Sequence, residues 1–330
     1  MYEKVNSNPD IYNIFVPLPN NPLKNLNCYV MKTPEKSLVI DTGFNREECK
    51  EALLGGLKEL GIEQDNIELF ITHLHSDHCG LVNKVAGPNT TIYMGRIDYE
   101  YMLEYADGDP WKKEEETYLR EGFPPDAIEE LRITNPARAY ALDKLFKAVC
   151  MDDGDEIKIG DYTLKCILTS GHTPGHMCLY MEKEKIMFLG DHVLFDITPN
   201  ITFWTRSRNS LLDYLNSLEK IKKYDVKLAL PAHRTNNGID FYERIAQIEK
   251  HHDFRLNQCM ELIGKNPGIN AYDLAGKMRW KMRGKSWADF PMPQKWFAVG
   301  ETIAHTDYLF EKGLIDRKMV NGINRYEIKM

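Results

Sequence analysis

The chain has 330 residues, 43% of them hydrophobic, and a formal net charge of −7. This composition excludes a disordered chain and allows a large core, so we expect one large domain and a smaller one. The sequence lacks an apolar run of ~18 residues, a signal-peptide pattern and a CxxC spacing among its seven cysteines. We therefore expect reduced thiols, no membrane contact and a cytoplasmic location.

The first predicted elements are strands near residues 12–17, 27–33 and 37–41. A helix is predicted over residues 46–60, because apolar side chains recur on one helical face: Cys49, Leu53, Leu57 and Leu60. This face is expected to cover a sheet.

The next strand, predicted over residues 67–71, leads directly into a dense group of potential metal ligands. An extended segment projects His73 and His75 to the same side, and a turn into a helix beginning near Gly80 can bring Asp77 and His78 round to meet them. Four ligands from one segment suit two ions. The alternative, a surface loop that is rich in histidine by chance, is strongly disfavoured.

A strand is predicted near residues 91–94, and residues 96–150 then break the alternation. They are helical in character and rich in Tyr and Leu, with Gly and Pro turns. We interpret them as a helical insertion that roofs the candidate metal site. Its aromatic and apolar side chains are candidates for lining an apolar pocket: Tyr99, Tyr101, Met102, Tyr105 and Trp111. The alternative is that each of them only anchors the insertion.

Further strands are predicted near residues 156–169, 177–181, 185–189 and 227–230, with an amphipathic helix over residues 211–223. Three candidate ligands follow such strands: His172, Asp191 and His233. Strand ends are rigid enough to hold ligands against the repulsion of two cations. The alternation predicts α/β layers, although periodicity alone does not separate a two-sheet sandwich from a doubly wound sheet.

Beyond residue 238 the sequence predicts a long helix through Ile245 and Met260, a short helix capped by Asn270 and a third helix from Glu301 to Lys312. A hairpin follows around Asn321-Gly322. Acidic side chains on the third helix have the wrong sign for entering a nucleic-acid groove. A scaffold role or a homodimer contact is therefore favoured.

With these segments in place, the chain resembles the metallo-β-lactamase-fold hydrolase superfamily, in the branch with a C-terminal winged-helix domain. The HxHxDH signature at residues 73–78 is complete, and Val39–Gly43 is similar to the family's first strand and turn. The resemblance implies an αββα sandwich with metals at one edge. Residues 1–238 would form the catalytic domain with its insertion at about 96–150, and residues 239–330 a winged-helix-like domain.

The resemblance also implies roles for individual residues. The first metal would be held by His73, His75 and His172, the second by Asp77, His78 and His233, and Asp191 would bridge them. Asp41 would orient a ligand histidine, and His176 and His192 are expected to support ligands or to pack, rather than to ligate. Cys79 is expected to be a small buried side chain.

Two bridged cations would generate a hydroxide nucleophile at neutral pH and polarise the substrate, and Asp77 would also accept a hydrogen bond from the nucleophile. Nitrogen and oxygen ligands favour zinc, with iron or manganese as alternatives. Lactamase activity is disfavoured, because the common periplasmic form has a cysteine ligand where this chain has Asp191.

The leading functional hypothesis is hydrolysis of a small ester or an acyl thioester. The alternative is a single-strand RNA endonuclease, motivated by a basic cluster that is interleaved with Trp280 and Trp287: Lys277, Arg279, Lys281, Arg283 and Lys285. That cluster is otherwise a solvated linker or a contact with the phosphates of a carrier such as coenzyme A. A non-catalytic metal-binding regulator is the least favoured hypothesis.

Overall fold

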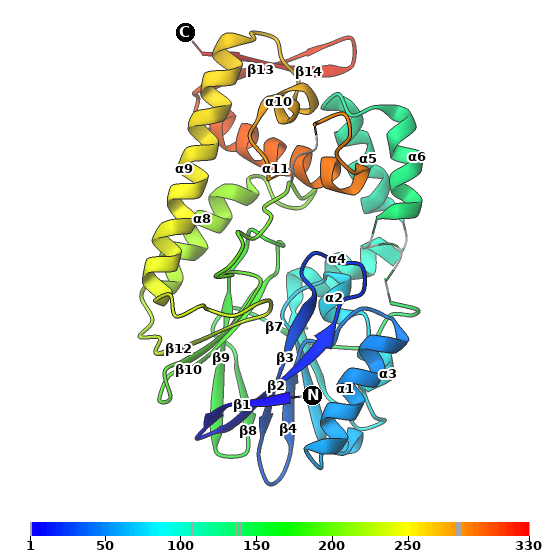
Figure 1. The fold of residues 1–330 in the computed structure, drawn as a ribbon, viewed down its shortest axis with the longest axis vertical. Helices are drawn as coiled ribbons and strands as arrows, with labels where there is room; N and C mark the ends of the chain where they lie inside the picture. Colours follow the sequence, from blue (N-terminus) through cyan, green and yellow to red (C-terminus); the bar gives the residue numbers. More distant parts are fainter. Residues whose placement is uncertain are drawn as a thin grey trace.

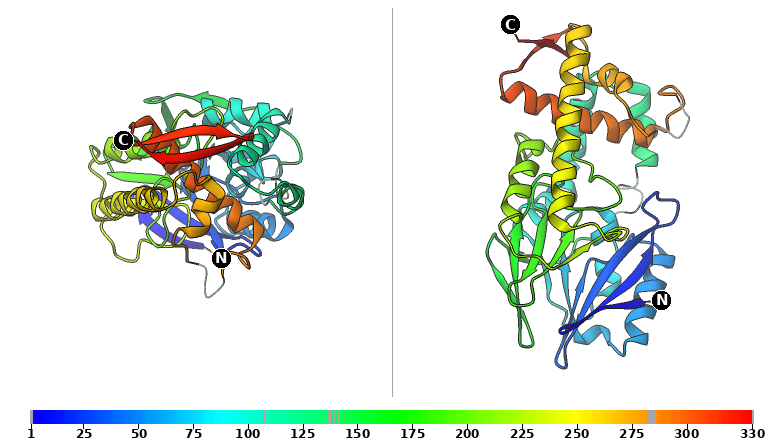
Figure 2. Two further views of the ribbon diagram at one scale, coloured as in Figure 1. Left: turned by 90° about the horizontal axis from the view of Figure 1, so that it is seen from above. Right: turned by 60° about the vertical axis from the view of Figure 1, so that its left-hand side comes forward.

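Two β-sheets lie face to face in one half of the molecule, and helices cover their outer faces (Figure 1). The computed structural model describes residues 2–106, 108–135, 138, 140, 142–281 and 286–329. The other half is an upper lobe of helices with a terminal hairpin. The long helix α9 (Phe241–Lys265) runs along both halves (Figures 1 and 2).

The first sheet holds seven strands, which lie side by side in sequence order. They are β1 (Tyr2–Ser7), β2 (Asp10–Pro17), β3 (Asn25–Lys32), β4 (Ser37–Ile40), β5 (Ile67–Ile71), β6 (Ile92–Gly95) and β7 (Val149–Met151). Strands β1 to β4 pair antiparallel, whereas β4 to β7 pair parallel. Strands β3 to β5 are almost entirely buried, which explains their continuous apolar runs.

The second sheet has five strands in the order β12-β11-β10-β9-β8. They are β8 (Glu156–Ile159), β9 (Tyr162–Leu168), β10 (Met177–Met181), β11 (Ile186–Gly190) and β12 (Leu228–Pro231). The chain reverses between β8 and β9, which pair as an antiparallel hairpin. The prediction of a single strand over residues 156–169 was therefore wrong.

Three apolar cores hold the layers together. Between the sheets, Phe70 and Phe188 are fully buried. The outer face of the first sheet packs against α1 (Glu47–Glu59) and α3 (Val82–Val85), and that of the second against α8 (Ser210–Ile221) and the start of α9. Truncating such a buried side chain to Ala typically costs ~2–5 kcal/mol. The predicted αββα sandwich is confirmed.

The inserted helices pack with the C-terminal elements to form the upper lobe. It contains α5 (Asp109–Arg120), α6 (Pro125–Thr134), α10 (Ala271–Lys277), α11 (Met292–Glu311), β13 (Ile315–Val320) and β14 (Ile323–Ile328). Tyr118 and Phe123 share one core with Ile263 and Val299. Because the insertion and the C-terminal elements share this core, the domain boundary at residue 238 and the winged-helix assignment stay predictions.

Several element boundaries differ from the predicted ones. Strand β1 was not predicted, and α11 begins at Met292 rather than at Glu301. The insertion begins with α4 (Arg96–Ala106) and ends before β7, which returns to the first sheet. The short helix α2 (Ser76–Cys79) begins within the ligand segment and not near Gly80.

The acidic residues of α11 are paired within the molecule. Glu301 is buried and accepts a hydrogen bond from Nε of Arg255 at 3.0 Å, and Asp307 lies 2.6 Å from Nη1 of Arg317. The acidic charge of these two residues is therefore compensated by neighbouring arginines. The exclusion of nucleic acid from this helix stays a prediction.

Within the described residues, no helix combines the length and the apolarity that crossing a bilayer requires. All seven cysteines lie in the described part of the chain and are free thiols, as predicted.

Candidate metal centre

The predicted ligands converge at one edge of the sandwich, where strands of both sheets end. Asp77 and His78 lie on α2, which follows β5. His172 lies in the connection between β9 and β10, Asp191 directly follows β11, and His233 comes two residues after β12. The structure therefore brings the four sequence segments together, as their common position after strands predicts.

Three imidazoles meet in a first cluster. Nδ1 of His75 lies 3.0 Å from Nε2 of His73 and 3.1 Å from Nε2 of His172. These three atoms form a group that could hold a metal ion. Burial and the neighbouring imidazoles lower the pKa of His73 and His75 well below the usual range, and burial lowers that of His172. Neutral rings offer the lone pairs that metal binding needs.

A second cluster combines a carboxylate with two imidazoles. Oδ2 of Asp77 lies 3.5 Å from Nε2 of His233 and 3.9 Å from Nε2 of His78. Both Nε2 atoms are buried without a hydrogen-bond partner among the described residues. Buried polar atoms are almost always satisfied, so a shared ligand at this point fits the donor set. This cluster is also a group that could hold a metal ion.

Asp191 lies between the two clusters. Its Oδ1 is 3.3 Å from Nε2 of His233 and 3.7 Å from Nε2 of His78, whereas its Oδ2 is 3.5 Å from Nε2 of His172. Burial raises the pKa of Asp191, but the surrounding imidazoles outweigh burial and lower this pKa below the usual range. The carboxylate therefore presents one oxygen to each cluster, as a bridging ligand would.

Hydrogen bonds at the far side of the rings orient four of the histidines. Nδ1 of His78 lies 2.8 Å from Oδ2 of Asp41, and Nδ1 of His73 lies 2.9 Å from Oγ1 of Thr72. Nδ1 of His172 and of His233 each face a backbone carbonyl oxygen, at 2.8 and 2.9 Å. With Nδ1 engaged, Nε2 of each ring is directed into the centre. Asp41 thus occupies the position expected of a residue that orients a ligand.

The charge on His78 depends on these carboxylates. Burial alone lowers the pKa of His78, but the neighbouring carboxylates, above all that of Asp41, outweigh burial and raise this pKa to about 10. A metal ion at Nε2 would therefore displace a proton from this ring.

His176 supports the bridging carboxylate through the backbone. Its Nδ1 lies 2.8 Å from Oγ1 of Thr169, and its Nε2 accepts a hydrogen bond from the backbone N–H of Asp191 at 3.1 Å. Gly190 makes this contact feasible. It has φ +51°, and a Cβ added there would lie 2.5 Å from Nε2 of His176. Both ring nitrogens of His176 therefore have hydrogen-bond partners, and its supporting role stays a prediction.

Two residues beside the ligands do not join the clusters. His192 is buried behind Asp191, with its ring 5.1 Å from that of Tyr214. The Cys79 thiol lies 3.3 Å from the Leu74 carbonyl oxygen, and burial raises its pKa far above the usual range. Both are placed as packing residues.

Asp98 was not predicted, yet it connects two ligand segments. The side chain is fully buried in α4 and accepts hydrogen bonds from the backbone N–H groups of Leu74 at 3.0 Å and Gly175 at 2.5 Å. It also accepts one from the hydroxyl of Thr173 at 2.6 Å. Leu74 lies between His73 and His75, and Thr173 follows His172. One carboxylate therefore fixes the backbone beside all three histidines of the first cluster.

An aromatic row extends from the first cluster into the insertion. The ring of Trp204 lies 5.8 Å from that of His75, and its Nε1 donates to the carbonyl oxygen of His172 at 3.0 Å. Tyr101 is 5.7 Å from Trp204 and 4.8 Å from Tyr105, which in turn is 4.8 Å from Trp111.

The insertion therefore packs against Trp204, which lies beside His75. Tyr101 and Tyr105 pack mainly against other rings. Tyr99 lies apart from the row, with its hydroxyl donating to the carbonyl oxygen of Phe146 at 2.9 Å. Sequence reasoning missed Trp204, which belongs to no predicted element. The pocket role of the four aromatic residues stays a prediction.

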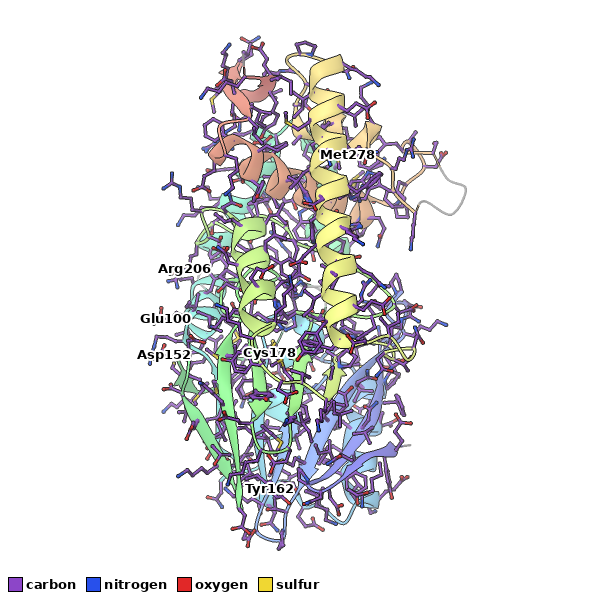
Figure 3. All side chains as sticks on the ribbon, turned by 90° about the vertical axis from the view of Figure 1, so that its left-hand side faces the viewer. Glu100, Asp152, Tyr162, Cys178, Arg206 and Met278 are labelled. Carbon is purple, nitrogen blue, oxygen red and sulfur yellow. The ribbon has the colours of Figure 1, made fainter. Side chains whose placement is uncertain are left out.

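Ion pairs hold the segment that carries Trp204 onto the insertion. Arg206 lies beside Glu100 of α4, with Nη1 3.4 Å from the carboxylate, and it also pairs with Glu104 (Figure 3). This segment and α4 therefore form one wall of the site.

Comparison with known families agrees with this geometry. Residues 22–233 match the family model described as the Metallo-beta-lactamase superfamily. The chain belongs to this superfamily. The matched range spans the four ligand segments, and the prediction of a metallo-β-lactamase-superfamily hydrolase is confirmed.

Curated members of the superfamily are distant in sequence. The chain is 25% identical over 259 residues to a Beta-lactamase-like protein 2 homolog of Caenorhabditis elegans, covering 78% of this chain and 71% of that protein. It is 27% identical over 233 residues to Acyl-coenzyme A thioesterase MBLAC2 of Bos taurus, covering 67% and 77%. An Atrochrysone carboxyl ACP thioesterase of Aspergillus fumigatus is 25% identical over 64% of this chain, which spans 51% of that protein.

Solved structures share the whole architecture. A Beta-lactamase domain protein from Burkholderia ambifaria has a TM-score of 0.83 at 24% identity, covering 99% of this chain and 94% of that chain. A metallo-beta-lactamase family protein from Thermus thermophilus has a TM-score of 0.77 at 24% identity, covering 97% and 98%. At these identities the similarity shows the fold, including the upper lobe.

Proposed function

We propose that the protein hydrolyses small esters or acyl thioesters at a dinuclear metal centre. The observation that carries the proposal is the position of Asp191, with one oxygen toward each of two adjacent ligand clusters. Two relatives at 25–27% identity are named as thioesterases, which supports an acyl thioester over other esters.

The donor set fits two divalent ions. His73, His75 and His172 would hold the first, Asp77, His78 and His233 the second, and Asp191 would bridge both. Imidazole and carboxylate donors suit zinc first, with iron or manganese as alternatives. When bound, the ions would lower the pKa of a bound water toward ~7 and polarise the substrate oxygen.

The chain's own residues prepare this chemistry. Asp77 holds its carboxylate beside His233, at the side of the centre where it is partly exposed, so it can accept a hydrogen bond from an attacking water. Asp41, Thr72 and the carbonyl groups behind His172 and His233 keep the rings in place during turnover. The indole ring of Trp204 lies beside the ring of His75, where it would exclude water and strengthen the electrostatic interactions within the site.

Turnover of a panel of acyl-CoA thioesters and small esters, by the wild type and by Asp77→Ala, tests the proposal. Thioester hydrolysis that is lost in the variant is the expected result. A fully metal-loaded wild type without activity on any ester or thioester would contradict it.

A single-strand RNA endonuclease is the second candidate, supported by the exposed side chains of Lys277, Arg279 and Lys281. The remaining basic residues of the predicted cluster, Arg283 and Lys285, lie outside the described residues. One face of the Trp280 ring is covered within the lobe, because the Arg255 guanidinium lies 3.8 Å from the ring centroid. That face is not free to stack on a base. This engagement favours the thioesterase. Cleavage of a labelled RNA, but of no thioester, would favour the RNA endonuclease over the thioesterase.

The cytoplasmic location and the homodimer also stay proposals.

A further inference from the structure

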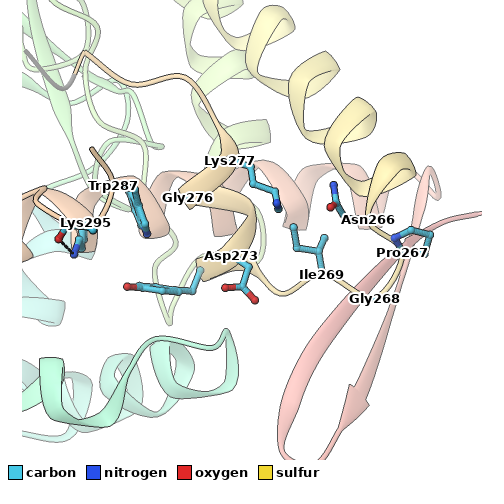
Figure 4. A pocket seen from close by; sticks show the side chains of 11 residues that line it. Asn266, Pro267, Gly268, Ile269, Asp273, Gly276, Lys277, Trp287 and Lys295 are labelled. Carbon is cyan, nitrogen blue, oxygen red and sulfur yellow. Dashed lines mark hydrogen bonds between the residues drawn. The ribbon is translucent and has the colours of Figure 1, made fainter. Parts of the chain in front are cut away.

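A cavity of about 690 Å³ opens in the upper lobe, in a part of the chain that the proposed hydrolysis does not use (Figure 4). It is lined by side chains of α10 and α11 and of the segments that precede them, among them Ile269, Tyr272, Lys277, Trp287 and Lys295. Its volume falls within the range of small-molecule sites.

The first unusual feature of the cavity is a buried lysine. Lys295 is only 7% exposed, and its Nζ donates one hydrogen bond, to the carbonyl oxygen of Ala288 at 2.9 Å. No described carboxylate lies within 4.0 Å of this ammonium group. An ammonium has three donors, and burying it without a counter-charge is costly. An anionic ligand in the cavity would supply both acceptors and charge.

The second feature is the local charge. The cavity is lined by two cationic side chains, Lys277 and Lys295, and by one carboxylate, that of Asp273, in a chain whose net charge is −7. Lys277 is exposed at the cavity. Asp273 also lines it, but its carboxylate accepts a hydrogen bond from the Asn270 side chain at 2.9 Å as part of the α10 cap. The cavity is therefore net positive.

The third feature is a pair of aromatic rings. The rings of Trp287 and Tyr272 have centroids 5.8 Å apart at 64°, so they form a corner rather than a stack. Figure 4 shows Lys295 on one side of Trp287 and Lys277 on the other, beyond Gly276. Aromatic faces next to cations recognise a planar base that carries a phosphate.

We propose that this cavity binds a nucleoside phosphate. The phosphate would lie against the exposed Lys277 and the base against Trp287 and Tyr272, and Lys295, on the other side of the Trp287 ring, would add positive charge. The ligand is either a free nucleotide or the nucleotide end of a coenzyme A thioester. Only the binding of a coenzyme A thioester rests on the proposed function.

Titration of the full chain with ADP, adenosine and inorganic phosphate, followed by calorimetry and tryptophan fluorescence, tests the proposal. We expect ADP to bind at least ~10-fold more tightly than adenosine or inorganic phosphate. Adenosine lacks the contacts with the lysines, and phosphate lacks the contacts with the aromatic rings. Lys295→Met and the exposed-residue variant Lys277→Gln should each weaken ADP binding at least ~10-fold, and Lys295→Arg should retain binding. Lys312→Gln, on the same lobe outside the cavity, is the matched control.

The absence of ADP binding, or equal binding by wild type, Lys295→Met and Lys277→Gln, would overturn the proposal. So would a single-stranded oligonucleotide that binds far more tightly than ADP with steep salt dependence, because that result assigns the surface to RNA. The exposed position of Lys277 keeps the test valid if Lys295→Met does not fold.

Two further measurements distinguish a free nucleotide from the nucleotide end of a coenzyme A thioester. If the ligand is the nucleotide of a carrier, Lys277→Gln should raise KM for acyl-CoA at least ~10-fold and leave turnover of the matching acyl-pantetheine unchanged. If it is a free nucleotide, KM for acyl-CoA should not change while ADP affinity still falls. Repeating the ADP titration with Asp77→Ala separates binding from hydrolysis, so failure of one proposal is distinguishable from failure of the other.

Discussion

The carboxylate of Asp98 accepts a hydrogen bond from the hydroxyl of Thr173 at 2.6 Å, which ties helix α4 to the segment that carries His172. Together with the bonds from Leu74 and Gly175, this contact makes Asp98 the point at which two ligand segments meet.

Replacing Asp98 should therefore weaken metal binding without removing any ligand. We expect Asp98→Ala to lower metal affinity or activity by ~10–100-fold, as loss of a ligand-supporting residue typically does. It should also destabilise the fold by at least ~2 kcal/mol, because it leaves three buried donors unpaired. Metal content after dialysis and urea unfolding measure the two effects. Leu103→Gln, at an exposed position of the same helix, is the control, and equal metal retention by both variants would refute the role.

Gly190 should tolerate no side chain, whereas Gly238 should tolerate one. Both have positive φ, but an added Cβ at Gly190 meets the ring of His176, and at Gly238 it meets nothing within 4 Å. Gly238→Ala is expected to cost only the ~1–2 kcal/mol of a left-handed backbone. Gly190→Ala should destabilise more and also lower activity, because it displaces the support of Asp191. Similar activity losses in both variants would contradict this assignment.

Stability should depend on pH through Glu114. This residue is 7% exposed and hydrogen-bonds to Tyr105, and burial raises its pKa to about 7. A raised carboxyl pKa means that the folded state holds a proton which the unfolded state releases. Glu114 therefore contributes about 3 kcal/mol to the free energy of unfolding below pH ~4.5. This contribution is lost as the pH rises to ~7.

Glu114→Gln cannot lose that proton. The free energy of unfolding of this variant, relative to wild type, should rise between pH 5 and pH 8. Parallel stability curves for the two proteins over this range would show that Glu114 titrates normally.

Trp204→Phe tests the wall of the site. The substitution keeps an aromatic ring near His75 but removes the donor to the His172 carbonyl oxygen. We expect kcat for thioester hydrolysis to fall by ~5–30-fold, since a lost hydrogen bond of ~1–2 kcal/mol would loosen a ligand segment. The metal content should stay at the wild-type level. An unchanged kcat would place Trp204 outside the catalytic surroundings.

The ligand segments could be predicted because each signal is local. His73, Asp191 and His233 all follow apolar strands at close range, and the spacing around His73 matches a known signature. The strands were recognisable for the same reason, since β3 to β5 are buried runs. By contrast, β1 is largely exposed and carries no such pattern.

The missed residues depend on contacts between distant parts of the chain. Asp98 has no distinguishing neighbours in sequence, and its partner Thr173 is 75 residues away. Glu301 pairs with Arg255, which lies 46 residues earlier, and nothing near Glu301 in the sequence indicates this partner. Such pairings appear only when the fold brings α4 to the second sheet and α11 to α9.

Turnover of an acyl-CoA thioester as a function of metal bound per chain tests the central claim most directly. Metal-free protein titrated with zinc should gain activity mainly with the second equivalent and reach a plateau at two ions per chain. Full turnover at one ion or none, or no turnover with two ions bound, would contradict a dinuclear thioester hydrolase.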